Sequence, residues 1–437
     1  MKKNILNSLF VSVFSLGLLC VASATDFSGD LLSKPSRFFE IKIDSDTMAA
    51  NNLFGLKDVL TKNVKVDLQE MVDNMSDDGF SLGAYNKESV FINMNFSSRF
   101  RFSIFTDVES SMRFNISKDL FDILGSGISI DDTKSIDIKS YGDVFYDMGF
   151  SLQTIIKDFG IKLTPTYFIP LVYLPKTTGN ATMYMKSNGE ISAQAYANVD
   201  VYTAVSMENY IDNDDSNKEL DLDIAEILSN GGFDMSLELE KNWLECLNAG
   251  LYTRIPIIPG KLNYKMSTIA YADFLEKNLM EFITDKDKEK PEPKTGHVKP
   301  STYNEEHENE EDGFEYSEET YKAYRPLKFG LNATYMPWGP WLKIQPSLGF
   351  AIRSPYTGEA MFYPEYALDI RLSVLKRIFN FNVGTAYRSQ IFQHYFGFGL
   401  NFRVLEIVSQ VSMCGTDFLS TFHTAGYGAF VGVRIGF

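Results

Sequence analysis

The stretch Gly426-Tyr427-Gly428-Ala429-Phe430-Val431-Gly432-Val433-Arg434-Ile435-Gly436-Phe437 indicates a β-strand with two different faces, because its residues alternate strictly along the chain. Successive side chains of a β-strand point to opposite faces of the sheet. One face of this strand would carry aliphatic and aromatic side chains, and the other mostly glycines with one arginine. Such a strand occurs in soluble sandwiches as well as in membrane barrels, so the rest of the chain has to decide between the two.

The same alternation recurs along the chain, most clearly in its C-terminal half. A soluble strand usually has about 5 to 6 residues, whereas a tilted membrane-spanning strand needs about 9 to 11. Most of the alternating segments match the longer figure. We therefore predict an all-β fold, a transmembrane antiparallel β-barrel of about 14 to 16 strands. The clear segments are 191–206, 233–240, 247–255, 342–353, 366–373, 379–388 and 396–404, and the weaker ones are 89–97, 99–110, 135–152, 158–173, 180–187, 260–273, 325–336 and 406–415.

The N-terminus has the pattern of a secretory signal. Lys2 and Lys3 precede an apolar run, and Ala22-Ser23-Ala24 supplies small residues for a signal peptidase, so residues 1–24 are predicted to be removed. A lipoprotein signal at Cys20 is the weaker alternative, because a leucine precedes that cysteine. No later stretch approaches the roughly 18 to 20 apolar residues of a membrane helix. Insertion into a membrane would therefore require a closed barrel.

Behind such a signal, the last strand resembles the closing strand of bacterial outer-membrane barrels, which ends in a terminal aromatic residue such as Phe437. The Gly-x-Gly strand from Gly397 to Phe402, the turn Arg403–Glu406 and a non-barrel N-terminal segment resemble the FadL-like group. The resemblance implies an outer-membrane barrel with an N-terminal hatch that carries hydrophobic molecules inward. It also implies that the barrel-assembly machinery recognises Phe437. Met48-Ala49-Ala50-Asn51-Asn52 lacks the proline of the family's hatch sequence, so no binding residue is carried over.

Two segments differ from the strand pattern. Within residues 25–88, leucines, valines and methionines between Leu53 and Met75 have helical spacing. They predict two short helices that either plug the barrel or cap its periplasmic end, with the barrel itself spanning 89–437. Residues 274–324 are highly charged and contain two charged runs: 285–290, in which acidic residues and lysines alternate, and the acidic run 305–312. We predict a largely disordered loop there, extracellular by strand counting and periplasmic if one strand is miscounted.

The sequence offers no convincing catalytic, cofactor or metal constellation. A loop metal site from His297, His307, Glu305 and Glu308 is conceivable, but flexible acidic loops are more often simply solvated. The net charge of −16 disfavours nucleic acid as a partner. Cys246 and Cys414 would form a disulfide only if their Cα atoms lie within about 7 Å, and otherwise serve as small apolar residues. We therefore expect no enzyme, no cofactor and no metal.

The polar faces of the predicted strands carry charged residues. In a dry interior each would cost several kcal/mol unless paired, whereas a hydrated lumen removes that cost. The lumen wall either contacts an ion or solute, or holds a network of arginine–carboxylate pairs that fills the lumen. The lumen-facing candidates are Arg101, Arg254, Lys343, Arg371, Arg403 and Arg434, together with Asp200, Glu238, Glu240 and Asp369.

The sequence thus predicts an outer-membrane channel or transporter for small or hydrophobic solutes. Its partners would be outer-membrane lipid and the solute. A general diffusion porin is one alternative, motivated by the charged strand faces. A surface adhesin or anchor that acts through residues 274–324 is another.

Overall fold

The structure is a computed structural model in which nearly every described residue lies in a strand or a turn between strands. It describes residues 31–33, 37–53, 75, 79–120, 122, 133–185, 191–208, 224–276, 294–302, 313–375, 377–422 and 426–437. No helix in these ranges is long and apolar enough to cross a membrane. The strands are β1 (Phe39–Asn51), β2 (Phe80–Asn95), β3 (Phe100–Ile116), β4 (Thr133–Ile156), β5 (Phe159–Met185), β6 (Ile191–Thr203), β7 (Gly232–Leu244), β8 (Leu247–Ile258), β9 (Gly260–Glu276), β10 (Lys294–Val298), β11 (Glu315–Ala323), β12 (Leu327–Tyr335), β13 (Leu342–Arg353), β14 (Met361–Val374), β15 (Phe379–Arg388), β16 (Ile391–Asn401), β17 (Leu405–Gly415) and β18 (Gly426–Gly436), and the helical elements are α6 (Ile224–Ser229), η1 (Gly339–Trp341) and η2 (Ser420–Phe422).

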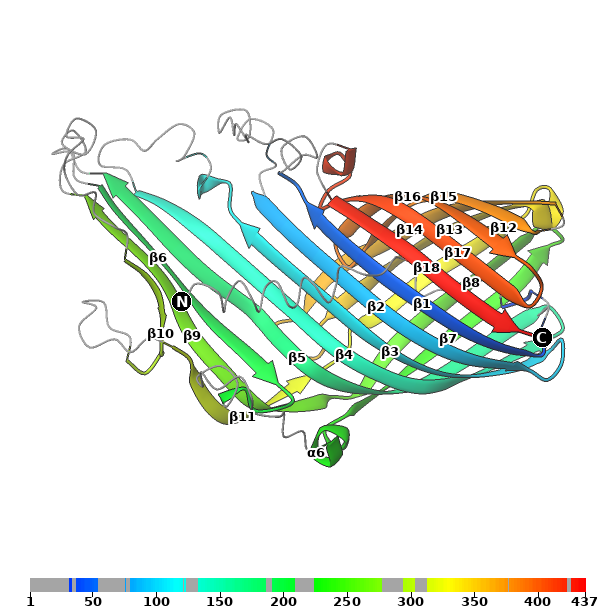
Figure 1. The fold of residues 1–437 in the computed structure, drawn as a ribbon, viewed down its shortest axis with the longest axis horizontal. Coiled ribbons are helices and arrows are strands. Elements are labelled where there is room, and N and C mark those ends of the chain that lie inside the picture. Colours follow the sequence, from blue (N-terminus) through cyan, green and yellow to red (C-terminus); the bar gives the residue numbers. More distant parts are fainter. Residues whose placement is uncertain are drawn as a thin grey trace.

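Among the described residues, fourteen strands form a closed antiparallel ring (Figure 1). Each strand of the ring pairs with the next, and β18 returns to pair with β1, so that Lys42 lies opposite Arg434. The predicted antiparallel barrel is therefore confirmed, with the lower of the expected strand numbers. A closed ring leaves no unpaired sheet edge, as a hydrocarbon environment demands. The ring runs β1, β2, β3, β4, β5, β7, β8, β12, β13, β14, β15, β16, β17, β18.

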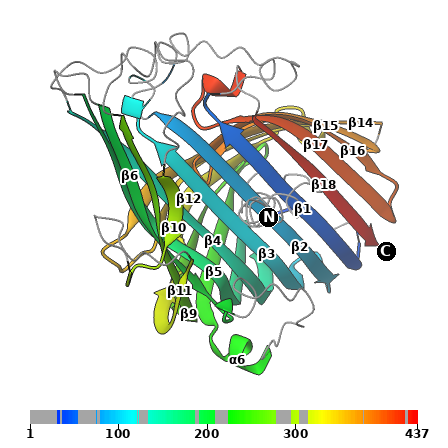
Figure 2. The same cartoon turned by 60° about the vertical axis from the view of Figure 1, so that its left-hand side comes forward.

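The remaining four strands, β6, β9, β10 and β11, continue the sheet beyond the ring, and we call them the extension (Figures 1 and 2). The N-terminal part of β5, Phe159–Phe168, pairs with β7, but from Val172 onward β5 pairs with β6. β6 pairs along its length with β9, which in turn pairs with β10 and β11. β6 and β7 thus occupy successive positions along the same side of β5.

The extension corrects the prediction for residues 274–324. β10 and β11 lie within that range, so the expected disorder is wrong at residues 294–298 and 315–323. The reason is that β9 supplies a backbone partner, and that Tyr321 stacks on Tyr173 and Tyr202 at centroid distances of 5.0 and 4.5 Å. Both charged runs lie outside the described residues.

The predicted N-terminal boundary also shifts. β1 and the first part of β2 fall within residues 25–88, yet both are ring strands. In the sequence β1 resembles a polar loop, because Lys42, Asp44 and Asp46 on its inner face are charged. Its outward-facing residues include Ile41 and Ile43. The predicted helices lie almost entirely outside the described residues, and the plug or cap remains a prediction.

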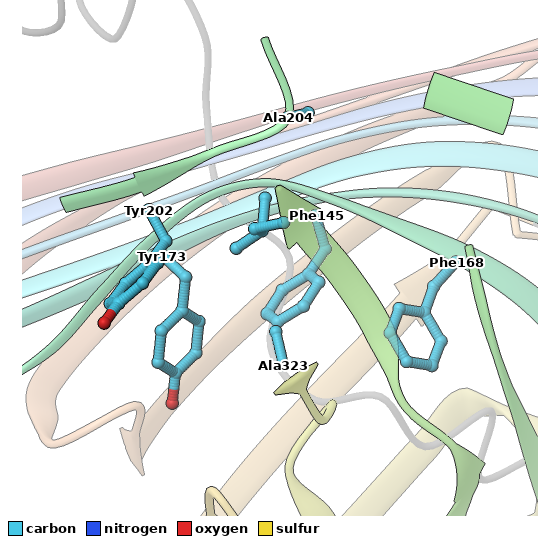
Figure 3. Packing of buried hydrophobic residues seen from close by; sticks show 7 residues of the cluster. Phe145, Phe168, Tyr173, Tyr202, Ala204 and Ala323 are labelled. Atoms are coloured by element: carbon cyan, nitrogen blue, oxygen red, sulfur yellow. The ribbon is translucent and has the colours of Figure 1, made fainter. Parts of the chain in front are cut away.

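The outer surface of the ring is apolar and the inner surface is polar. Large exposed side chains on the outside include Ile92, Phe150, Val383 and Phe396. Where the extension leaves the ring, a buried cluster fills the joint with side chains from β4, β5, β6, β9 and β11 (Figure 3). This packing holds the extension against the wall. The cluster consists of Phe145, Phe168, Tyr173, Tyr202, Ala204, Leu262 and Ala323.

Candidate functional site in the barrel lumen

The lumen is hollow at one end of the barrel. At this end short turns join the strands, β1 begins and β18 ends. A cavity of about 1030 Å³ lies there, and it joins a second cavity of about 530 Å³ deeper inside. The two share lining residues such as Glu40, Arg101 and Arg434. We call the larger cavity the vestibule. Most of the residues that line it are polar, with amide side chains such as Gln345 and Asn382 among the charged ones.

Five of the six predicted lumen cations line these cavities. Arg101, Lys343, Arg371 and Arg434 border the vestibule, and Arg254 borders the deeper cavity. Arg403 does not, because it lies in the exposed turn between β16 and β17 with φ of 69°. Its carbonyl oxygen there accepts a hydrogen bond of 2.6 Å from Arg37. The placement of Arg403 on a strand face is therefore wrong, because β16 ends two residues earlier, at Asn401.

The four predicted carboxylates have different surroundings. Glu238 and Asp369 line the deeper cavity and the vestibule respectively. Glu240 is buried and accepts a hydrogen bond from the Leu31 amide, at 2.6 Å. Asp200 belongs to the extension, where it lies 3.4 Å from the Lys265 ammonium.

The deeper cavity ends at a set of buried ion pairs that cross the lumen, which we call the charge belt. Three arginines on one side, Arg325, Arg353 and Arg388, reach carboxylates on β1, β3 and β4. Each arginine is at most 5% exposed. Buried pairs of this kind fix the relative positions of the elements that carry them. The pairs are Arg325 with Asp147 and Glu109, Arg353 with Asp143 at 3.0 Å, and Arg388 with Asp46 at 2.7 Å.

Aromatic rings complete the belt. Arg353 lies over the rings of Tyr173 and Tyr141, 4.5 and 4.9 Å from their centroids. Arg388 lies 4.8 Å from the ring of Tyr85, and Arg325 lies 5.2 Å from that of Phe145. Cation–π contacts of this kind gain strength when the groups are desolvated. A small cavity of about 20 Å³ lies among the belt residues, beside Arg325 and Arg353.

A buried apolar cluster lies beside the belt. It consists of Met48, Tyr85, Ile391, Cys414 and Phe430 on strands β1, β2, β16, β17 and β18, and Phe430 also borders the vestibule. Polar contacts add to it, since the backbone carbonyl of Gln390, in the turn after β15, accepts a hydrogen bond from Arg113 on β3. Among the described residues, the belt and this cluster thus occupy part of the lumen at mid-height. Cys414 and Cys246 are both free, so the disulfide alternative is not the one adopted.

The sequence interpretation missed most of the belt. Arg325 lies in the three-residue connector between β11 and β12, where no alternation exists to reveal its direction. Asp107 and Glu109, and likewise Asp143 and Asp147, are spaced by even numbers within predicted strands, so they share a face. That spacing is the signal that could have located the acidic side of the belt.

Asp107, Glu109 and Asp147 also meet the geometric requirement for a cation site, with carboxylate oxygens within 4.8 Å of one another. The cations that neutralise them are side chains of the chain itself. Arg325 pairs with Glu109 and Asp147, and Lys87 lies 3.7 Å from both Asp107 and Glu109. These carboxylates are therefore assigned to the belt.

Comparison with known proteins gives likeness only at the level of three-dimensional structure. No family model matches the sequence, and no curated protein matches it. The chain is similar to a TodX deltaS2S3 mutant monoaromatic hydrocarbon channel, with 8% identity over 96% of this chain and 97% of that one and a TM-score of 0.44. It is also similar to the P. putida toluene transporter TodX, with 8% identity over 95% and 96% of the two chains and a TM-score of 0.41. A Pseudomonas aeruginosa FadL homologue gives 10% identity over 92% and 90%, with a TM-score of 0.40. These likenesses assign no residue and no solute to the present chain.

Proposed function

We propose that the protein is an outer-membrane channel in which the charge belt closes the lumen between passages of a small polar solute. The observation that carries the proposal is the order of features along the barrel axis: first the polar vestibule, then the deeper charged cavity, and then the belt. The apolar outer surface, the short turns at one end and the longer connections at the other favour a barrel whose vestibule faces the periplasm. Nothing in this arrangement calls for catalysis.

The lining favours a polar solute over a hydrophobic one. An apolar solute in the vestibule would remove water from the charged and amide side chains around Lys343, Arg371 and Asn382. It would offer them no hydrogen bonds in place of water, so its binding would cost free energy. A freely open diffusion porin is the weaker alternative, because Arg325 and Arg353 fill the section that such a porin would leave to water. An adhesin function would rest on the extension, which projects beyond the ring (Figure 1).

Conductance in planar bilayers tests the proposal. Detergent-purified, folded protein should show rare or no open steps, whereas Arg325→Ala combined with Arg353→Ala should show stable open steps, because the two substitutions remove two of the three belt arginines. Arg371→Ala is the matched control: it also removes a lumen arginine, but from the vestibule wall. Open steps of equal size in the wild type and the belt variant would refute the closing function of the belt. Silence of the belt variant would refute the channel.

A further inference from the structure

The short helix α6 has an apolar side that the rest of the fold covers only in part. With 3.6 residues per turn, Ile224, Ile227 and Leu228 lie within roughly a third of the helix circumference. Ile227 packs against the buried cluster at the joint between the ring and the extension. Ile224 and Leu228 are 64% and 42% exposed. One apolar residue therefore attaches the helix to the wall, and two more remain at the surface.

The helix lies beside the outer surface of the ring, where Figure 1 shows it projecting from the wall. Thr166 of β5 lines the deeper cavity, so the next residue, Tyr167, faces outward. Its hydroxyl donates a hydrogen bond to the backbone carbonyl of Leu228. In the strand register Tyr167 pairs with Phe233 of β7, and Phe233 pairs with Ile258 of β8, which is 54% exposed. The exposed side of α6 thus continues the apolar outer wall.

The lengths of the neighbouring strands place α6 at a membrane surface. β7 and β8 have 13 and 12 residues, close to the roughly 9 to 11 that a tilted strand needs to cross the hydrocarbon layer. Both strands have one end at the vestibule and the other end beside α6. β4 and β5 have 24 and 27 residues, and their excess length lies in the extension. The helix therefore marks the height at which the ring leaves the membrane, on the side away from the vestibule.

Two lysines lie on the face of the extension that adjoins α6. Asn263 of β9 donates to the Glu226 carboxylate of α6 at 3.3 Å, and it accepts a hydrogen bond from Thr320 of β11, also at 3.3 Å. Lys261 is two positions from Asn263 and Lys322 is two positions from Thr320, so both lysines share this face. They are exposed and are direct register partners. Two opposed ammonium groups thus lie next to the apolar side of the helix.

We propose that α6, Lys261 and Lys322 form a docking surface for a lipid leaflet that contains anionic head groups. Ile224 and Leu228 enter the boundary between head groups and acyl chains, as the apolar side of an interfacial helix does. The two ammonium groups meet the head-group phosphates, which relieves the repulsion between directly opposed like charges.

Two observations select lipid as the occupant. The surface is continuous with the apolar outer wall at Ile258, and its cations complement an anionic head group. Docking at this point fixes the height of the extension, which then stands outside the membrane. The inference rests on the proposed function only in taking the ring as embedded in the membrane.

Spin-label accessibility in vesicles tests the docking of α6. Cys246→Ser removes the half-buried native thiol, whereas Cys414 is fully buried and stays unlabelled. Leu228→Cys then carries a nitroxide, and Asn198→Cys, at an exposed position of β6 in the extension, is the matched control. In vesicles that contain phosphatidylglycerol, the ratio of oxygen accessibility to accessibility for a water-soluble nickel complex should be several times higher at position 228 than at position 198.

Vesicles of phosphatidylcholine alone isolate the contribution of the head groups. Without anionic lipid, the docked population should fall about fivefold for each lysine that meets a phosphate, so the label at position 228 moves toward water. Lys261→Gln combined with Lys322→Gln should cause the same change in phosphatidylglycerol vesicles and make the label insensitive to lipid charge. Lys241→Gln is the matched control, because Lys241 lies over the Trp243 ring at the vestibule end of β7.

The folded state of each variant is checked by its heat-modifiable mobility. Equal accessibility ratios at positions 228 and 198 would overturn the docking. A label position that responds neither to lipid charge nor to the two lysines would overturn the head-group contact. Magnetic broadening between labels on different molecules would assign the surface to a second copy of the chain and overturn the lipid assignment. None of these results alters the conductance expected of the belt variants, so the docking surface and the channel can fail separately.

Discussion

Replacement of Arg325 by methionine is the sharpest test of the charge belt. The arginine is 1% exposed and pairs with Asp147 and Glu109, so the substitution leaves two carboxylates in the lumen without their shared partner. Removing one member of a buried ion pair typically costs about 3 to 5 kcal/mol. Glu109 keeps the Lys87 ammonium at 3.7 Å, so we expect a loss within that range that comes mainly from Asp147.

Neutralising Glu109 and Asp147 as well distinguishes the electrostatic cost of removing Arg325 from the cost of changing its packing. In the triple variant Arg325→Met, Glu109→Gln, Asp147→Asn no uncompensated charge remains, and apolar replacement of a buried ion pair is often neutral. We expect the triple variant to regain most of the stability that the single variant loses. Replacing Arg371 of the vestibule by methionine should change stability by less than about 1 kcal/mol, because its guanidinium is 44% exposed to the cavity.

The assay is equilibrium unfolding by urea of protein folded into vesicles, followed by the fraction that keeps heat-modifiable mobility. A single variant as stable as the wild type would show that the belt pairs contribute nothing net. A triple variant no more stable than the single one would show that the loss comes from packing. Either result would refute the electrostatic account of the belt.

Three further outcomes follow from other parts of the fold. Burial raises the pKa of Tyr202 to about 12, against an ordinary value of 10.0, so the stability that this residue gives the extension should be present below pH 10 and lost between pH 10 and 12. Limited proteolysis across that range should show a smaller loss in Tyr202→Phe than in the wild type, because burial also raises the pKa of the neighbouring Tyr321, which remains. Gly250→Ala places a Cβ 2.2 Å from a backbone carbonyl of β7 and should cost about 1 to 3 kcal/mol in urea unfolding, whereas Gly399→Ala, whose nearest contact is 3.4 Å, should cost less. Deleting Phe437 removes its ring contact with Phe39, 5.7 Å between centroids, and should lower the folded fraction both in cells and on refolding into vesicles. A defect confined to cells would point instead to recognition by the assembly machinery.

The fold was largely predictable because alternation is a local signal. Strands such as β16 and β18 show it without interruption, since their outer residues must be apolar and their inner residues need not be. β1 was missed because Asp44 and Asp46 on its inner face make the segment look like a polar loop. β10 and β11 were missed because their strand character comes from pairing with β9, which no local pattern records.

The candidate site was only partly predictable for the same reason. Alternation indicated that Lys343 and Arg371 face inward, but not that they stand opposite each other, since that depends on the length of the turn between β13 and β14. Arg325 was beyond reach, because its partners are 178 and 216 positions away along the chain. The two members of such a pair come close to each other only when the strands have closed into the ring, so the sequence alone does not reveal them.

The span of these ion pairs has a consequence for assembly. Asp46 and Arg388 are separated by 342 positions, and the ring itself closes between the first strand and the last. Contacts of such separation form late, because the entropy of closing the intervening chain has to be met first. The belt ion pairs can therefore close the lumen only after the ring itself has closed. A chain that stops folding before that step would have an open, leaking lumen, so a closed lumen indicates that folding is complete.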